Sequence, residues 1–88
     1  MMYRSKSYLE FIRSRPCLMC GAPETVAHHE PLGSAGKGIK APDSHCVPLC
    51  AYCHQLAHHI GLKSFWRRHD IKMEIIKLLT KYLEEKQI

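Results

Sequence analysis

Two pairs of cysteines constrain the fold of this chain more than any other feature. Cys17 and Cys20 form one pair with two residues between them, and Cys50 and Cys53 form the other. Four thiolates in two such pairs are the ligand set of one tetrahedral structural zinc ion. The alternatives are four reduced cysteines without a metal, or a zinc site that shares a histidine. We expect the zinc site, because a chain of 88 residues has a modest core that a metal commonly reinforces.

The N-terminal residues indicate the compartment. They lead into a charged amphipathic segment that has neither the apolar region of a secretory signal nor a run long enough to span a membrane. We therefore expect a cytoplasmic protein without a membrane partner. In that reducing compartment paired cysteines are more often metal ligands than disulfides. The fifth cysteine, Cys46, lies outside both pairs and is predicted to be a small buried hydrophobic residue.

The charge balance favours a polyanionic partner such as nucleic acid. The chain has 13 Lys and Arg against 8 Asp and Glu, which gives a formal net charge of +5. A solvated charged face that binds nothing in particular is the alternative, so this signal needs support from a site.

The apolar pattern predicts a single small α+β domain over residues 1–88. Two short β-prone segments, 25–29 and 46–49, flank a glycine-rich loop and should form a two-stranded ribbon. Gly61 should end one helix, and Asp70 should cap the last one. The helices are expected over residues 5–14, 51–59, 62–69 and 70–86.

The last of these helices carries one apolar stripe, which consists of Ile71, Ile75, Leu78, Leu79, Tyr82 and Leu83. So small a domain needs this area for its own core, and we therefore expect a monomer. The alternative is that the stripe is the seam of a dimer, which would make the chain an interaction protein.

Histidines form a second set of candidate metal ligands. His54 and His58 are four residues apart, so on a helix they project from nearly the same side. His28 and His29 are neighbours in a predicted strand and should point to opposite faces, so one would ligate and the other would face a substrate. Three imidazoles with open positions beside them suit a catalytic metal. The histidine that does not ligate is a natural general base.

Taken together, these residues resemble the HNH endonuclease family, the ββα-metal or His-Me finger nucleases. The resemblance covers residues 17–66: the cysteine pairs, AHH at 27–29, a glycine loop, and VPLCAYCHQLAH at 47–58. The segments GKGIKAPD at 36–43 and HHIGLKSFW at 58–66 are further similar to a prophage-borne branch that includes the RecA-dependent nuclease Ref. The resemblance implies a ββα-metal core, extended by a short N-terminal helix and by C-terminal helices.

The resemblance also assigns roles to individual residues. It implies that His28, His54 and His58 bind a catalytic divalent metal, which could be Mg²⁺, Mn²⁺, Ni²⁺ or Zn²⁺, and that His29 is the general base. The family's middle asparagine, which orients the loop that holds the base, falls at His45. A histidine can donate one hydrogen bond to a loop carbonyl as an amide does, but this departure leaves open an extra ligand or a lowered activity.

The activity implied is hydrolysis of DNA phosphodiester bonds to a 5′-phosphate and a 3′-hydroxyl, in a phage or prophage context with a recombination or phage protein as partner. Cationic side chains would contact the DNA backbone. The candidates are Lys37, Lys40, Lys63, Arg67 and Arg68.

A different class of function stays open at this point. The chain could be a zinc-finger nucleic-acid-binding module whose nuclease site is degenerate and non-catalytic, and His45 is the residue that favours this alternative. His59 and His69 match nothing in the family pattern and are predicted to be surface residues.

Overall fold

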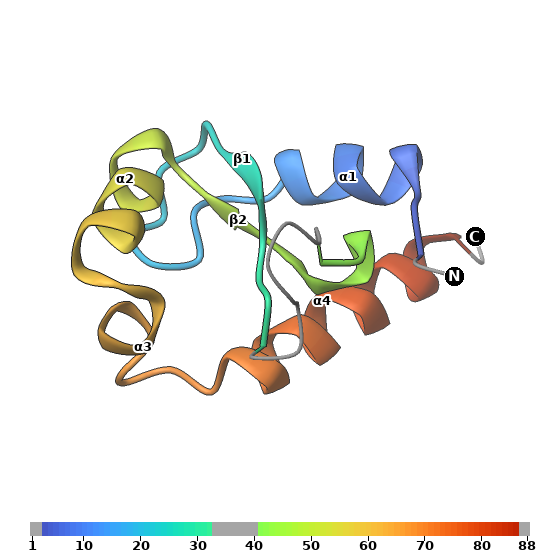
Figure 1. Cartoon of the computed structure of the whole chain (residues 1–88). Helices are drawn as coiled ribbons and strands as arrows, with labels where there is room; N and C mark the ends of the chain where they lie inside the picture. The colour runs from blue at the N-terminus through green and yellow to red at the C-terminus, as the bar shows by residue number, and fades with distance from the viewer. Residues whose placement is uncertain (1–2, 33–40, 87–88) are drawn as a thin grey trace.

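A short antiparallel ribbon lies at the centre of the computed structural model, which describes residues 3–32 and 41–86. The prediction of a small α+β domain with a two-stranded sheet is confirmed. Two helices lie at one end of the ribbon and two at the other (Figure 1). In chain order the elements are α1 (Lys6–Arg13), β1 (Val26–His29), the 3-10 helix η1 (Asp43–His45), β2 (Cys46–Leu49), α2 (Ala51–Ile60), α3 (Leu62–Phe65) and α4 (Ile71–Lys86).

The register of the ribbon separates the two histidines of β1. His28 pairs with Val47, and His29 pairs with Cys46. Paired residues share a face of an antiparallel sheet, and neighbours along a strand point to opposite faces. His28 therefore lies on the face of Val47, and His29 lies on the face of Cys46.

Each face of the ribbon carries its own apolar core. The α2-side core contains Cys17, Val47, Leu49, Cys50, Cys53, Ala57, Phe65, Trp66 and Ile75. The α1-side core contains Tyr8, Ile12, Cys46 and Tyr82, with Leu9, Phe11 and Ala27 packed against it. Cys46 is fully buried, as predicted. Helix α4 contributes to both cores through Leu78 and Leu79 and so holds the two halves of the domain together.

Side-chain caps fix where the helices begin. The Ser5 hydroxyl accepts a hydrogen bond from the Tyr8 N–H at 3.1 Å, which starts α1. Asp70 accepts from the Met73 N–H at 3.2 Å in the same way and starts α4, as predicted. Gly61 ends α2 at a φ of +90°, a backbone angle that residues other than glycine rarely adopt. These caps account for the agreement between predicted and observed helix bounds.

Two expectations for the C-terminal half need correction. The helix expected over 62–69 ends at Phe65, because residues 66–69 fold into a turn in which the His69 N–H donates to the Trp66 carbonyl at 2.8 Å. In α4 the apolar stripe is buried or partly buried except for Leu83, which is exposed. None of the helices in the described part of the chain has the length and apolar character needed to cross a membrane.

Loss of an isoleucine from the α1-side core should destabilise the protein more than loss of an exposed isoleucine. Ile12 is 0% exposed in α1, whereas Ile76 is 54% exposed in α4. We expect Ile12→Ala to lower the free energy of unfolding by about 2–5 kcal/mol, through lost burial and the cavity left behind. The matched variant Ile76→Ala should change it by less than about 0.5 kcal/mol. Denaturant unfolding measures both, and equal losses would contradict the packing described.

Candidate functional site

The four paired cysteines meet in one cluster. Their sulfur atoms all lie within 4.8 Å of one another, and Cys20 Sγ is 3.6 Å from Cys50 Sγ. Neither pair is a disulfide. Four sulfurs at about 2.3 Å from a tetrahedral zinc ion would be about 3.8 Å apart, close to the observed separation. The residues present therefore fit a structural metal site, and we expect zinc to occupy it.

Backbone hydrogen bonds bring the two cysteine pairs together. The Leu18 N–H donates to the Pro48 carbonyl at 2.9 Å, which ties the first pair to β2. Gly21, with a φ of +79°, turns the chain so that its N–H reaches the Cys17 carbonyl at 2.8 Å. Cys50 is the N-cap of α2, and its sulfur accepts from the Cys53 N–H at 3.4 Å. One sulfur thus both belongs to the cluster and starts the helix.

The electrostatics of the cluster favour a bound cation. Burial alone would raise the pKa of Cys17, but backbone hydrogen bonds from Cys50, Cys20 and Met19 lower it to about 6. Burial, followed by hydrogen bonds within the cluster, raises the pKa of Cys53 well above the ordinary thiol value. One thiol ionises easily and then opposes ionisation of its neighbour. A metal ion removes this conflict because it stabilises every thiolate at once.

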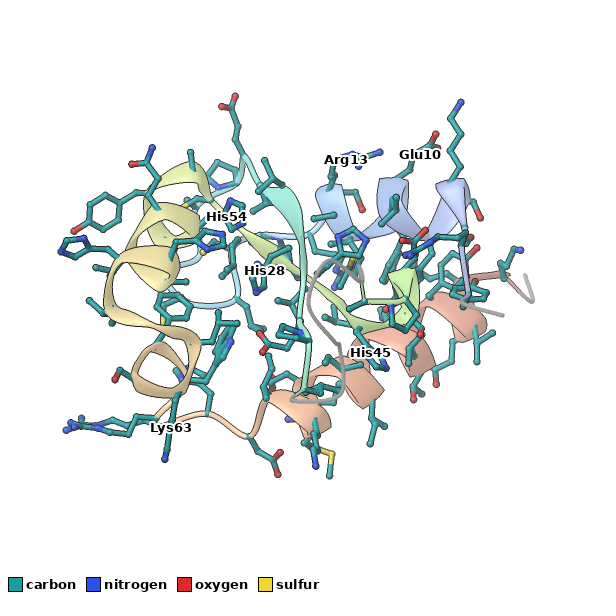
Figure 2. All side chains as sticks on the ribbon, viewed as in Figure 1. Glu10, Arg13, His28, His45, His54 and Lys63 are labelled. Atoms are coloured by element: carbon teal, nitrogen blue, oxygen red, sulfur yellow. The ribbon has the colours of Figure 1, made fainter. Side chains whose placement is uncertain are left out.

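The second cluster brings His28 of β1 together with His54 and His58 of α2. One ring nitrogen from each lies within 4.8 Å of the other two, and His54 Nε2 is 3.2 Å from His58 Nε2. Figure 2 shows His28 and His54 facing each other across the gap between strand and helix, with ring centroids 5.2 Å apart. Two nitrogens at about 2.05 Å from a tetrahedral ion would be about 3.3 Å apart, so this cluster also fits a metal.

The environment keeps His54 in the form that binds metals. Burial lowers the pKa of His54, and the neighbouring rings of His28 and His58 lower it further. A lowered pKa means that the neutral imidazole dominates at neutral pH, and the neutral ring is the one that can donate a lone pair to a metal.

A buried carboxylate supports His28 from behind. Glu30 Oε2 lies 3.2 Å from His28 Nε2 and accepts a hydrogen bond from the Trp66 indole N–H at 2.6 Å. His28 and Glu30 are each 4% exposed. A carboxylate that is hydrogen-bonded to a histidine orients the ring and makes it a stronger ligand. Trp66 in turn fixes the carboxylate, which links the end of α3 to the histidine cluster.

His29 has a different set of partners on the opposite face of the ribbon. Its Nε2 is 2.8 Å from Asp43 Oδ1 of η1. The same oxygen lies 3.1 Å from Arg4 Nη1, and Asp43 Oδ2 accepts the Ser5 N–H at 2.8 Å. The N-terminal segment, η1 and the catalytic candidate His29 are thus joined through one carboxylate.

Cys46 lies beside this pair, and ligand atoms of His29, Asp43 and Cys46 also come within 4.8 Å of one another. Both oxygens of Asp43 are already occupied by N–H donors, and one of those donors is the cationic guanidinium of Arg4. A nearby cation disfavours a second one. We therefore describe this third group as a hydrogen-bonded network.

The remaining predicted residues are distributed over the surface and the loops. His45 Nδ1 is buried and has no hydrogen-bond partner among residues 3–32 and 41–86, and the glycine loop whose carbonyl this histidine could bond lies outside those residues. In Figure 2 His45 lies on the η1 side of the ribbon, apart from His28 and His54. His59 and His69 are exposed, as predicted. Lys37 and Lys40 lie outside the described residues.

Three of the basic candidates lie together near α3. Lys63, Arg67 and Arg68 are exposed, and Lys63 extends outward from α3 (Figure 2). Both arginines line a surface pocket that also includes Ser64 and His69. The structure therefore gathers these cations at the end of the domain that carries α2 and α3.

Sequence reasoning missed Glu30 entirely and noted Trp66 and Asp43 only as parts of motifs. The available signals were an acidic residue two positions after His28 at the end of an apolar strand, and the only tryptophan of the chain. Neither signal identifies the partner of the side chain, because the contacts join residues that are 36 and 14 positions apart.

Comparison with known proteins adds a family but no activity. A family model described as "Protein of unknown function (DUF968)" matches residues 1–84. The chain is also 35% identical over 72 residues to the Escherichia coli K12 protein "Uncharacterized protein YdfU", a match that covers 81% of this chain and 20% of that relative. The chain thus spans about a fifth of the relative's length. No solved structure matches.

Removal of the metal should unfold the domain, because the cysteine cluster joins the segment of Cys17 and Cys20 to β2 and α2, and the two apolar cores are small. We expect the purified protein to contain zinc with Zn–S distances near ~2.3 Å by X-ray absorption. Cys20→Ser should lose this zinc and most helical circular dichroism, whereas Cys46→Ala should keep the metal. A disulfide between Cys17 and Cys20, or cysteines without any metal, would contradict this expectation.

Proposed function

The chain belongs to the DUF968 family of proteins of unknown function, and from the side chains that meet around its ribbon we propose that it is a metal-dependent endonuclease of the HNH class. Its substrate would be DNA, and hydrolysis of a phosphodiester bond would leave a 5′-phosphate and a 3′-hydroxyl. One observation carries the proposal. His28 joins a cluster of three imidazoles, while the next residue, His29, is held on the other face by a carboxylate.

The histidine cluster supports a second metal in addition to the structural one. His28, His54 and His58 would hold a divalent ion through three neutral imidazoles, which leaves room for water and substrate. Such an ion, when bound, supplies positive charge to a phosphate and to its departing oxygen. Glu30 keeps the His28 ring in place, so the ligand set is ordered before substrate arrives.

His29 would act as the general base. Its side chain is 18% exposed, so water can reach the ring, whereas His28 is nearly inaccessible. His29 follows the ligand His28 directly in β1, with its ring on the opposite face of the ribbon, so the substrate phosphate would have to reach both rings at this strand. A neutral imidazole is a suitable acceptor for a proton from water. The resulting hydroxide attacks phosphorus, the bond to the 3′-oxygen breaks, and that oxygen takes a proton from solvent.

The cysteine cluster would serve this site as a scaffold. Cys53 and His54 are adjacent in α2, so a metal that fixes the first turn of this helix also fixes the histidines that follow. The basic side chains near α3, Lys63, Arg67 and Arg68, would neutralise phosphates along the DNA and supply affinity that does not depend on sequence.

The proposal can be tested by a plasmid nicking assay with Mg²⁺, Mn²⁺, Ni²⁺ and Zn²⁺. We expect His29→Ala to lower the cleavage rate by ~10²–10⁴-fold, the range that general bases contribute, while metal content and DNA affinity stay unchanged. His59→Ala is the matched control, since His59 is an exposed histidine on α2, and it should cut like the wild type.

Two results would count against this assignment. Wild-type rates for His29→Ala would remove the base role from His29. A wild type that binds DNA but fails to cut with every metal would overturn the nuclease and favour the binding module, with His45 as the first position to examine.

The carboxylate behind His28 gives a test of the metal site that does not depend on cleavage. We expect Glu30→Gln to weaken binding of the second metal by ~10–100-fold, because the amide no longer orients and polarises the imidazole. Trp66→Phe should weaken it less, since it removes only the bond that holds Glu30. Isothermal titration with Ni²⁺ on the zinc-loaded protein measures both affinities. Unchanged affinity in Glu30→Gln would show that Glu30 does not act on the ligand.

A further inference from the structure

We propose that Asp43 is the positioning residue of the general base: it holds His29 with the proton on Nε2, so that Nδ1 is the atom that takes the proton from water. This inference rests on the proposed nuclease function for its catalytic consequence. The arrangement of the ring itself follows from the contacts of His29 and can be tested without any cleavage.

The position of the Asp43 carboxylate is fixed by its other partners. Asp43 is 3% exposed at the start of η1. Its Oδ2 accepts the Ser5 N–H at 2.8 Å, and its Oδ1 lies 3.1 Å from Arg4 Nη1 as well as 2.8 Å from His29 Nε2. A carboxylate anchored from the N-terminal segment cannot rotate away from His29. It therefore restrains the ring in both position and orientation.

The same partners keep the carboxylate ionised. Burial by itself would raise the pKa of Asp43, but hydrogen bonds from His29, from the Ser5 N–H and from Arg4 outweigh burial and lower it. An ionised carboxylate has acceptors and no donor. Because the Ser5 N–H and the cationic Arg4 side chain also donate to this carboxylate, it meets His29 as an acceptor, and the His29 nitrogen in contact with it must carry a hydrogen, which in a neutral imidazole leaves the lone pair on Nδ1.

The proton balance then involves this pair, the attacking water and bulk solvent. Nδ1 takes one proton as the water oxygen bonds to phosphorus, and His29 becomes an imidazolium with a hydrogen on each nitrogen. Asp43 stays ionised and stabilises that positive charge across the existing 2.8 Å contact. After the 3′-oxygen has left with a proton from solvent, Nδ1 releases its own proton to solvent, and the starting tautomer returns.

Asp43 would thus orient the general base, the role that the resemblance assigns to His45. The resemblance placed the residue that holds the base at His45, but His45 Nδ1 is buried with no hydrogen-bond partner in the described part of the chain. Asp43 is two positions earlier in the same short 3-10 helix, and it makes the contact with His29 that His45 Nδ1 does not. The function of the middle residue is retained by a different side chain, and the orienting contact is made by a charge instead of an amide.

The test compares wild type, Asp43→Asn and a matched control, Asp70→Asn. Asp70 is an exposed aspartate that caps α4, and asparagine caps a helix equally well. Long-range ¹H–¹⁵N NMR of the zinc-loaded protein, without a second metal or DNA, reads the tautomer of His29, which is assigned by the signals missing in His29→Gln. Single-site nicking kinetics give kcat and KM for the same proteins.

We expect wild type and Asp70→Asn to hold His29 with the proton on Nε2, and Asp43→Asn to lose that preference because an amide can donate as well as accept. The kcat of Asp43→Asn should fall by ~10²-fold or more with KM nearly unchanged, as happens where an aspartate sets a histidine tautomer. A purely structural role would leave the tautomer unaltered.

Each outcome distinguishes this proposal from the nuclease proposal. Wild-type His29 with its proton on Nδ1 would overturn the positioning role even if Asp43→Asn failed to fold, and so would a wild-type kcat in Asp43→Asn. An inactive wild type in which the tautomer still depends on Asp43 would refute the nuclease and leave the ring assignment supported.

Discussion

The pairing of β1 with β2 is the interaction on which the rest of the structure depends. It sets His28 opposite Val47 and His29 opposite Cys46, so the two histidines enter different environments. A shift of one residue in this register would exchange every side chain between the two faces. His29 would then face α2, His28 would face Asp43, and neither of the contact sets described above could form. Only four residues in each strand hold this register, and the cores on both faces must therefore reinforce it.

The parts of the fold that could be predicted from sequence are those set by local chemistry. Ser5, Asp70 and Gly61 act within one helical turn of their own positions, and the helix bounds follow from them. The spacing of two residues between cysteines and of four between His54 and His58 is likewise local. Each spacing places the side chains on one side of a turn or a helix before any tertiary contact forms.

The parts that could not be predicted are contacts between segments that are distant in sequence. Glu30 bonds with Trp66 across 36 positions, and Arg4 reaches Asp43 across 39. Neither pair has a periodicity or a motif, since each depends on how two cores pack against the same ribbon. The early end of α3 is a case of the same kind. Trp66 leaves the helix and enters the α2-side core, where its indole N–H finds a buried acceptor.

The double role of Cys50 has a consequence for the order in which the domain assembles. Its sulfur satisfies the Cys53 N–H at the start of α2 and also belongs to the thiol cluster. The first turn is the least favourable step in forming a helix, and α2 has only ten residues to offset that cost. Capture of a metal by the cysteines would therefore lower the barrier to forming this helix. His54 and His58 would lie on the same side of α2 only after this helix has formed. The histidine cluster would therefore assemble after the cysteine cluster.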